Sequence, residues 1–168
     1  IGRQLGFAVR NVDNYGGHID LPGKNGKIMA IIGHLDVVPA GSGWSHEPYG
    51  GEIAEGKMYG RGTLDDKGPV ISCLYAMKAL KDAGFVPEPT VRLILGLDEE
   101  SGWKGIKYYF EKEKRPDYGF TPDADFPLIN GEKGLMIFGL AKKFGKFSAE
   151  GLTLRSLKGG NAPNSVAD

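Results

Sequence analysis

The chain has 168 residues, of which 40% are hydrophobic and 25% are charged, so it is long enough for one ordinary domain with a buried core. Its 21 Lys and Arg residues balance its 21 Asp and Glu residues, and a balanced chain has no net field that draws it to nucleic acid or to an anionic membrane. Composition therefore excludes binding driven by net charge, and selectivity must come from a local site.

The only cysteine, Cys73, lies in an apolar helical pattern, and we interpret it as a core residue. A single cysteine forms no internal disulfide, which is typical of a reducing compartment. The sequence also predicts neither a membrane span nor a secretory leader. We therefore expect a cytoplasmic protein without a membrane partner, whose oligomeric state the sequence does not indicate.

The apolar pattern predicts four strands and a hairpin. The strands are expected at residues 7–12, 18–21, 27–33 and 90–97, and the hairpin turns near Glu55 and Gly56. Residues 27–33 are a nearly continuous apolar run, which is typical of a strand that is covered on both faces.

Two helices are predicted between and after the later strands. In residues 69–83 the apolar positions recur at intervals of three and four, with Pro69 near the first helical position and Gly84 just past the end. Residues 101–114 form the second helix, with Ser101 as its expected N-cap. The alternation of strands and helices predicts an α/β fold, a mixed sheet with helices on both faces.

Beyond about Gly131 the pattern changes to two strand-like segments without a convincing helix. We therefore predict a domain boundary there. Residues 1–130 are expected to form the N-terminal part of the α/β domain. Residues 131–168 begin a second domain that is too short to be whole.

Four polar clusters fall where strands end or helices begin: HLD at 34–36, LDDKG at 64–68, DEES at 98–101 and TPDADF at 121–126. One such cluster is usually a turn or a helix cap. Four clusters on successive loops would meet at the carboxyl edge of a sheet. Their carboxylates would raise one another's pKa values unless a cation compensated the negative charge. Oxygen and imidazole ligands without a thiolate indicate Zn²⁺, Mn²⁺ or Co²⁺.

Two of the clusters predict individual roles. In an extended segment His34 and Asp36 lie on the same side, so Asp36 can accept a hydrogen bond from the imidazole and leave its other nitrogen free for a metal. The side chains of the adjacent residues Glu99 and Glu100 diverge, so one can bind a metal while the other acts as a general base. The alternative for this pair is a capped helix start.

Together, GHLDVVPAG, YGRGTLDDKGP, DEESGW and TPDADFPLINGEKG resemble the dinuclear zinc metallopeptidase family of carboxypeptidase G, aminoacylase, succinyl-diaminopimelate desuccinylase and carnosinase. Within this family the motifs most resemble those of the bacterial dipeptidase V (Xaa-His dipeptidase) type. The similarity runs from about residue 7 to residue 168, with the motifs in the family's order. It implies a zinc-binding catalytic domain, incomplete in this chain, followed by the first strands of an α+β lid domain.

The resemblance also implies a site with two zinc ions, or with Mn²⁺ or Co²⁺ in their place. Glu99 would be the general base and Asp36 the residue that orients the histidine. The peptide bond between Asp65 and Asp66 is expected to be cis. The implied metal ligands are His34 and Asp123 on the first metal, Asp65 between both metals, and Glu100 on the second.

The function implied is hydrolysis of the peptide bond in dipeptides or short peptides by a metal-activated water. Three alternatives stay open: an N-acyl amino acid deacylase of the same family, a non-catalytic metal-binding fragment, and a plain α/β domain whose acids cap helices. The chain has only His18, His34 and His46, of which we interpret the first and last as structural or surface residues. It lacks the family's second-metal and lid histidines, so we expect a fragment that is inactive alone.

Overall fold

The computed structural model describes residues 1–125, 127–131, 134, 139 and 141. The contacts divide the chain into two units, Ile1–Ala124 and Asp125–Asp168. Every strand and helix described lies in the first unit. The strands expected beyond Gly131 lie outside the described residues, so the domain boundary near Gly131 and the lid domain stay predictions.

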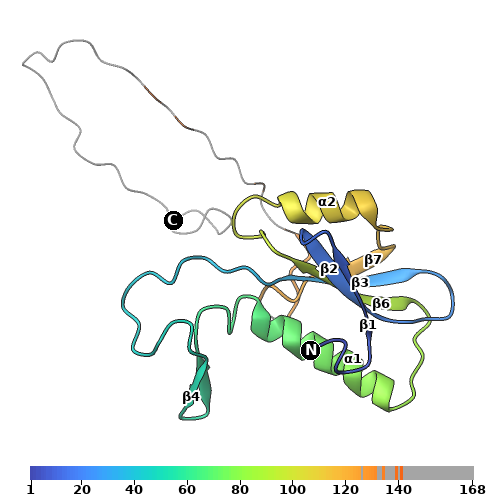
Figure 1. The fold of residues 1–168 in the computed structure, drawn as a ribbon, viewed down its shortest axis with the longest axis horizontal. Coiled ribbons are helices and arrows are strands. Elements are labelled where there is room, and N and C mark those ends of the chain that lie inside the picture. The colour runs from blue at the N-terminus through green and yellow to red at the C-terminus, as the bar shows by residue number, and fades with distance from the viewer. Residues whose placement is uncertain (126, 132–133, 135–138, 140, 142–168) are drawn as a thin grey trace, which may run out of the picture. The chain divides into compact units, whose positions relative to one another are not determined.

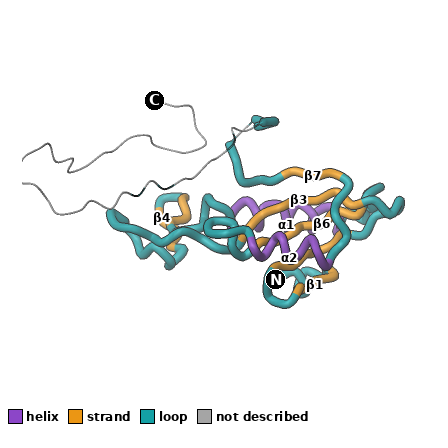
Figure 2. Tube along the Cα trace, turned by 90° about the horizontal axis from the view of Figure 1, so that it is seen from above, coloured by secondary structure: helices purple, strands orange, loops and turns teal. Residues whose placement is uncertain are grey.

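A five-stranded mixed sheet forms the centre of the first unit, in the order β1-β2-β6-β3-β7. Strands β1, β2 and β6 are antiparallel neighbours, whereas β3 runs parallel to both β6 and β7. Figure 2 shows β1 and β7 on the two outer sides of the sheet. The bounds are β1 Ala8–Val12, β2 Gly16–Leu21, β3 Ile28–His34, β6 Thr90–Gly96 and β7 Tyr118–Phe120.

Helices α1 (Lys67–Asp82) and α2 (Lys104–Lys112) lie on opposite sides of this sheet (Figure 1). The predicted α/β fold with helices on both faces is therefore confirmed. Each helix covers one of two apolar clusters. The first cluster includes Val70, Leu74 and Met77 of α1 with Ile31 and Leu93 of the sheet, and the second includes Tyr109 of α2 with Ala30 and Ile94.

Helix α1 begins two residues earlier than predicted. Proline is accepted within a first helical turn because the N–H groups there have no partner inside the helix. Pro69 therefore lies inside the first turn, and the N–H of Val70 donates to the carbonyl of Asp66 at 3.0 Å. Cys73 is half-buried and packs against the first cluster, close to its predicted place in the core.

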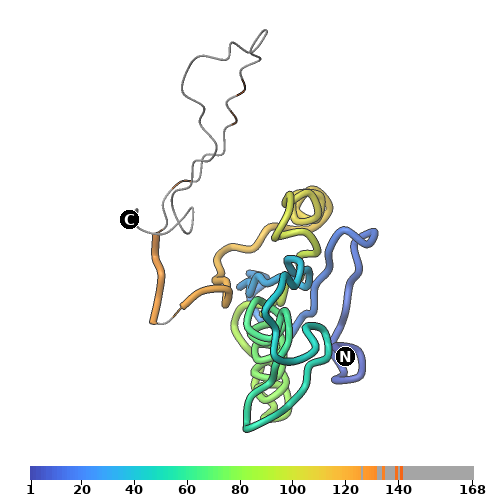
Figure 3. The backbone as a smooth tube through the Cα atoms, turned by 90° about the vertical axis from the view of Figure 1, so that its left-hand side faces the viewer, coloured from blue at the N-terminus to red at the C-terminus, as the bar shows by residue number. Residues whose placement is uncertain are grey.

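The long segment between β3 and α1 contains the predicted hairpin, formed by β4 (Glu52–Ala54) and β5 (Lys57–Tyr59). Its turn lies at Glu55 and Gly56, which both have positive φ angles of 50° and 73°, as a two-residue hairpin turn requires. Figure 3 lets the reader follow this segment from β3 to α1. Among the described residues, no helix combines the length and the apolar run needed to cross a bilayer.

Candidate metal centre

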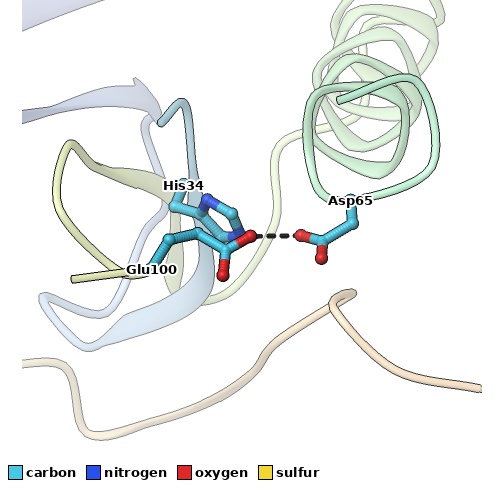
Figure 4. Close-up of side chains that lie close together, drawn as sticks. All are labelled: His34, Asp65 and Glu100. Carbon is cyan, nitrogen blue, oxygen red and sulfur yellow. Dashed lines mark hydrogen bonds and ion pairs between the residues drawn. The ribbon is translucent and has the colours of Figure 1, made fainter. Parts of the chain in front are cut away.

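Two parallel strands end side by side and bring the polar clusters together. In the register of β3 and β6, His34 pairs with Gly96, so the residues that follow β6 emerge next to His34 at the carboxyl edge of the sheet. The segment before α1 brings Asp65 to the same place. Figure 4 shows His34, Asp65 and Glu100 pointing toward one another from these three segments.

All four predicted metal ligands lie at this edge. Nε2 of His34 is 2.9 Å from Oδ1 of Asp65 and 3.4 Å from Oδ2 of Asp123. The possible ligand atoms fall into two groups, each within 4.8 Å: His34 with Asp65 and Glu100, and His34 with Asp66 and Asp123. The structure therefore brings the predicted ligands together, with His34 common to both groups.

The hydrogen bond of His34 determines its tautomer. Nδ1 lies 3.0 Å from the backbone carbonyl of Asp36, and because a carbonyl can only accept, Nδ1 holds the proton. Nε2 faces acceptors as well, Oδ1 of Asp65 at 2.9 Å and Oδ2 of Asp123 at 3.4 Å, so without a metal a second proton on the imidazole stabilises this contact. A divalent metal would take the place of that proton, and the donor set of one imidazole and several carboxylates fits such an ion.

Asp36 acts at this site differently from the sequence prediction. The backbone carbonyl, and not the carboxylate, makes the closer contact with the imidazole, since Oδ1 is 3.4 Å from Nδ1. The two carboxylate oxygens accept the backbone N–H groups of Glu99 and Glu100, each at 3.1 Å. One residue thus contacts both the histidine and the segment with the two glutamates.

The electrostatics of the cluster agree with a site for a cation. Burial raises the pKa of Glu99, Glu100 and Asp123, and neighbouring carboxylates add to each shift. For His34, burial lowers the pKa, but the hydrogen bond to Asp36 and the negative charge of Asp123 outweigh it and raise the pKa overall. The cluster therefore holds excess negative charge, which a divalent ion would neutralise.

Asp66 is a member of the cluster that the sequence prediction did not include. It is fully buried, and its Oδ2 accepts the backbone N–H of His34 at 3.2 Å. Among the described residues Oδ1 has no hydrogen-bond partner, and burial raises the pKa of Asp66 to about 6. The peptide bond between Asp65 and Asp66 is cis, as expected. Sequence alone offers no signal that separates the roles of two adjacent aspartates.

The N-cap of α2 also differs from the prediction. The prediction that Ser101 caps this helix is wrong. Helix α2 begins after Trp103, which has a left-handed φ of 57° and makes no side-chain cap. The carboxylate of Asp98 accepts the N–H groups of Lys104 at 2.7 Å and Gly105 at 3.0 Å. Aspartate is preferred at helix starts, but Asp98 lies six residues before Lys104, the first residue of α2. The local sequence pattern therefore did not indicate Asp98 as the cap.

The two other histidines lie away from the cluster. His18 is buried, and its Nδ1 is 2.8 Å from the hydroxyl of Tyr109. His46 stacks on Tyr59 and lies 3.0 Å from a carboxylate oxygen of Glu52. In the described part of the chain, neither histidine belongs to a group that could hold a metal.

Known proteins resemble this chain over most of its length. A beta-Ala-Xaa dipeptidase of Lactobacillus delbrueckii subsp. lactis is 46% identical over 161 residues, which are 95% of this chain and 34% of the relative. The chain thus spans about a third of the length of this curated relative, a share that fits the expected fragment.

Two solved structures share the fold. Human carnosine dipeptidase 1 aligns with a TM-score of 0.63 and 28% identity, over 74% of this chain and 31% of that one. An M20 metallo-carboxypeptidase from Sulfolobus solfataricus aligns with a TM-score of 0.63 and 25% identity, over 73% of this chain and 30% of that one. The α/β fold is therefore that of metallopeptidase catalytic domains.

The region that matches the family model contains the cluster of predicted metal ligands. The model described as peptidase family M20/M25/M40 matches residues 30–152, a range that contains all four predicted ligands and both glutamates of the DEE run. The chain belongs to peptidase family M20/M25/M40.

Proposed function

We propose that the protein containing this chain is a metal-dependent dipeptidase that hydrolyses the peptide bond of dipeptides or similarly short peptides. The observation that supports this most is the convergence of His34 with the carboxylates of Asp65, Glu100 and Asp123. The family match and the dipeptidase names of similar proteins support the reaction class.

The site residues take the following roles in this proposal. His34 would bind the first metal through Nε2, because Nδ1 is occupied by the carbonyl of Asp36. Asp123 would be the other protein ligand of that metal, Asp65 would be a ligand shared by both metals, and Glu100 would be a ligand of the second. Zinc is the proposed ion, with Mn²⁺ or Co²⁺ as substitutes, since imidazole and carboxylate ligands suit all three.

Two bound metals would supply the Lewis acid that lowers the pKa of the attacking water and polarises the substrate carbonyl. Glu99 accepts the proton of that water and returns it to the leaving amine. Burial of Glu99 raises the pKa of its carboxyl, which makes the side chain a stronger base than an exposed glutamate. The carboxylate of Asp36 accepts the backbone N–H of Glu99 and so holds the base in place.

A deacylase that removes an acyl group from an N-acyl amino acid is the second candidate, because peptide and deacylation chemistry need the same metals and the same base. The names of similar proteins favour the dipeptidase. A cytoplasmic location is part of the proposal and is supported by the single cysteine.

The experiment is a substrate panel with the purified full-length protein, loaded with zinc. We expect β-alanyl and α-linked dipeptides to be cleaved and N-acetyl and N-succinyl amino acids to be stable. Cleavage of the N-acyl compounds alone would replace the dipeptidase with the deacylase. A protein that binds zinc at His34 but cleaves neither class would leave only the non-catalytic metal-binding module.

A further inference from the structure

We infer that Asp98 is a positioning residue that fixes the two glutamates of the site, Glu99 and Glu100. The inference rests on the proposed function, because it concerns the geometry of the proposed base and the proposed second-metal ligand. In the described part of the chain, Asp98 belongs to neither group of candidate ligands. Its action on the site must therefore run through its neighbours.

Asp98 is the centre of the turn that joins β6 to α2. Five backbone N–H groups of the next seven residues donate to this one residue. The carbonyl of Asp98 accepts those of Ser101 at 3.4 Å, Gly102 at 3.1 Å and Trp103 at 3.0 Å, and its carboxylate accepts those of Lys104 at 2.7 Å and Gly105 at 3.0 Å.

The first N–H groups of a helix have no partner inside the helix, and the N-cap residue Trp103 makes no side-chain hydrogen bond. The carboxylate of Asp98 is therefore the group that caps α2. The fit is close, because a Cβ added at Gly105 would lie 2.9 Å from Oδ1 of Asp98 and 2.3 Å from the carbonyl oxygen of Tyr15. Only glycine lets the helix start approach this near.

The two glutamates lie between two aspartates that hold the turn from both sides. Asp36 accepts the N–H groups of Glu99 and Glu100, and Asp98 accepts those of the five residues that follow. Asp36 therefore ties the turn to the end of β3, whereas Asp98 ties it to α2.

Helix α2 is a fixed support for this turn. Tyr109 in its second half is fully buried against the sheet, and the Tyr109 hydroxyl pairs with the buried His18 of β2 at 2.8 Å. Loss of the Asp98 cap would let the helix start separate from the turn while the rest of α2 stays in place. The turn after Glu99 would keep the three bonds to the Asp98 carbonyl but would lose the two carboxylate bonds that tie it to α2.

The test compares Asp98→Ala, Asp98→Asn and a matched control in the full-length zinc enzyme. The control is Asp117→Ala, which removes a carboxylate that likewise accepts a backbone N–H, that of Ile28 at 2.8 Å. Ile28 lies at the opposite end of β3 from His34. The control therefore reports the general effect of losing such a bond, away from the site.

Because a displacement of about 1 Å at a reacting group can cost about 100-fold in rate, we expect Asp98→Ala to lower kcat by about 10- to 100-fold with KM changed less than about threefold. Asp98→Asn should recover part of the loss, since its amide oxygen can still accept the N–H of Gly105, and the N–H of Lys104 is exposed, so water can accept it. Asp117→Ala should keep the wild-type kcat.

Hydrogen exchange at the amides of Glu99 and Glu100 gives a second readout that needs no substrate. It should be faster in Asp98→Ala than in the wild type and unchanged in Asp117→Ala. Wild-type kcat or unchanged exchange in Asp98→Ala overturns the inference, as does an equal loss of kcat in the control. A wild-type enzyme that cleaves no dipeptide refutes the proposed function instead, and the exchange rates alone then decide the role of Asp98.

Discussion

Replacing Asp36 should weaken metal binding although its carboxylate is not a predicted ligand. In the structure its two oxygens accept the N–H groups of Glu99 and Glu100 at 3.1 Å each. Asp36→Ala removes both acceptors and frees the segment that includes Glu100. Asp36→Asn is the sharper variant, because its amide has one acceptor oxygen, and its NH₂ group would face the other N–H as donor against donor.

The magnitude follows from these two bonds. A hydrogen bond to a charged acceptor contributes about 1.5 to 3 kcal/mol, and the side chain of Asp36 is only 20% exposed. Water can replace part of the loss, so we expect Asp36→Ala to lower the free energy of unfolding by about 2 to 3 kcal/mol in total. Loss of a residue that orients metal ligands typically lowers metal affinity by about 10- to 100-fold.

The assay is zinc competition with a chromogenic chelator on the metal-free full-length protein, combined with urea unfolding. Asp36→Asn should resemble Asp36→Ala more than the wild type in zinc affinity. The control, Asp117→Asn, should change the unfolding midpoint but not the zinc affinity. A wild-type zinc affinity in Asp36→Asn would refute the reasoning, because it would mean that the two N–H contacts do not position the ligands.

Two further predictions concern the buried pair on the α2 side of the sheet. Tyr109→Phe keeps the ring but leaves Nδ1 of His18 buried without its partner, which should lower the free energy of unfolding by about 1 to 3 kcal/mol in urea titrations; an unchanged midpoint would contradict this. Burial, with the charge of Arg92, lowers the pKa of His18 below 6.5. The stability that neutral His18 contributes is therefore fully present above pH 6.5, the pKa of an unfolded histidine. It is lost as the pH falls through the lower pKa that His18 has in the folded protein. Unfolding titrations from about pH 8 to about pH 5 should show this loss in the wild type and not in His18→Asn, and equal pH slopes would refute it.

The central elements of the fold could be predicted because their signals are local and periodic. The apolar runs of β3 and β6 and the three-and-four spacing of α1 follow from burial on the two faces of a sheet. Once these strands are parallel neighbours, their ends must meet at one edge. That rule is why His34 and Glu100 could be expected at a common site.

The edge strand β7 could not be predicted. It has three residues, all exposed, so it shows no alternation of apolar and polar side chains. Its existence depends on pairing with Met29 to Ile31 of β3, about 90 positions earlier in the chain, and no local pattern encodes such a pairing.

The details of the site depended equally on distant contacts. Asp65 and Asp66 are identical side chains in adjacent positions, and only the fold makes one half-exposed at the ligand cluster and the other fully buried under the N–H of His34. Ser101 satisfied the local rule for an N-cap. Asp98 took that place because the turn brings its carboxylate back onto the start of α2.

The substitution Glu99→Gln in the full-length protein tests the central claim most directly, with zinc content and dipeptide turnover measured on the same sample. Glutamine has nearly the same size but cannot accept the proton of the attacking water, and loss of a general base typically costs about 100- to 10,000-fold in rate. We predict wild-type zinc content with a loss of kcat in that range. Wild-type turnover, or a loss of zinc comparable to that in His34→Ala, would contradict the assignment of Glu99 as the base.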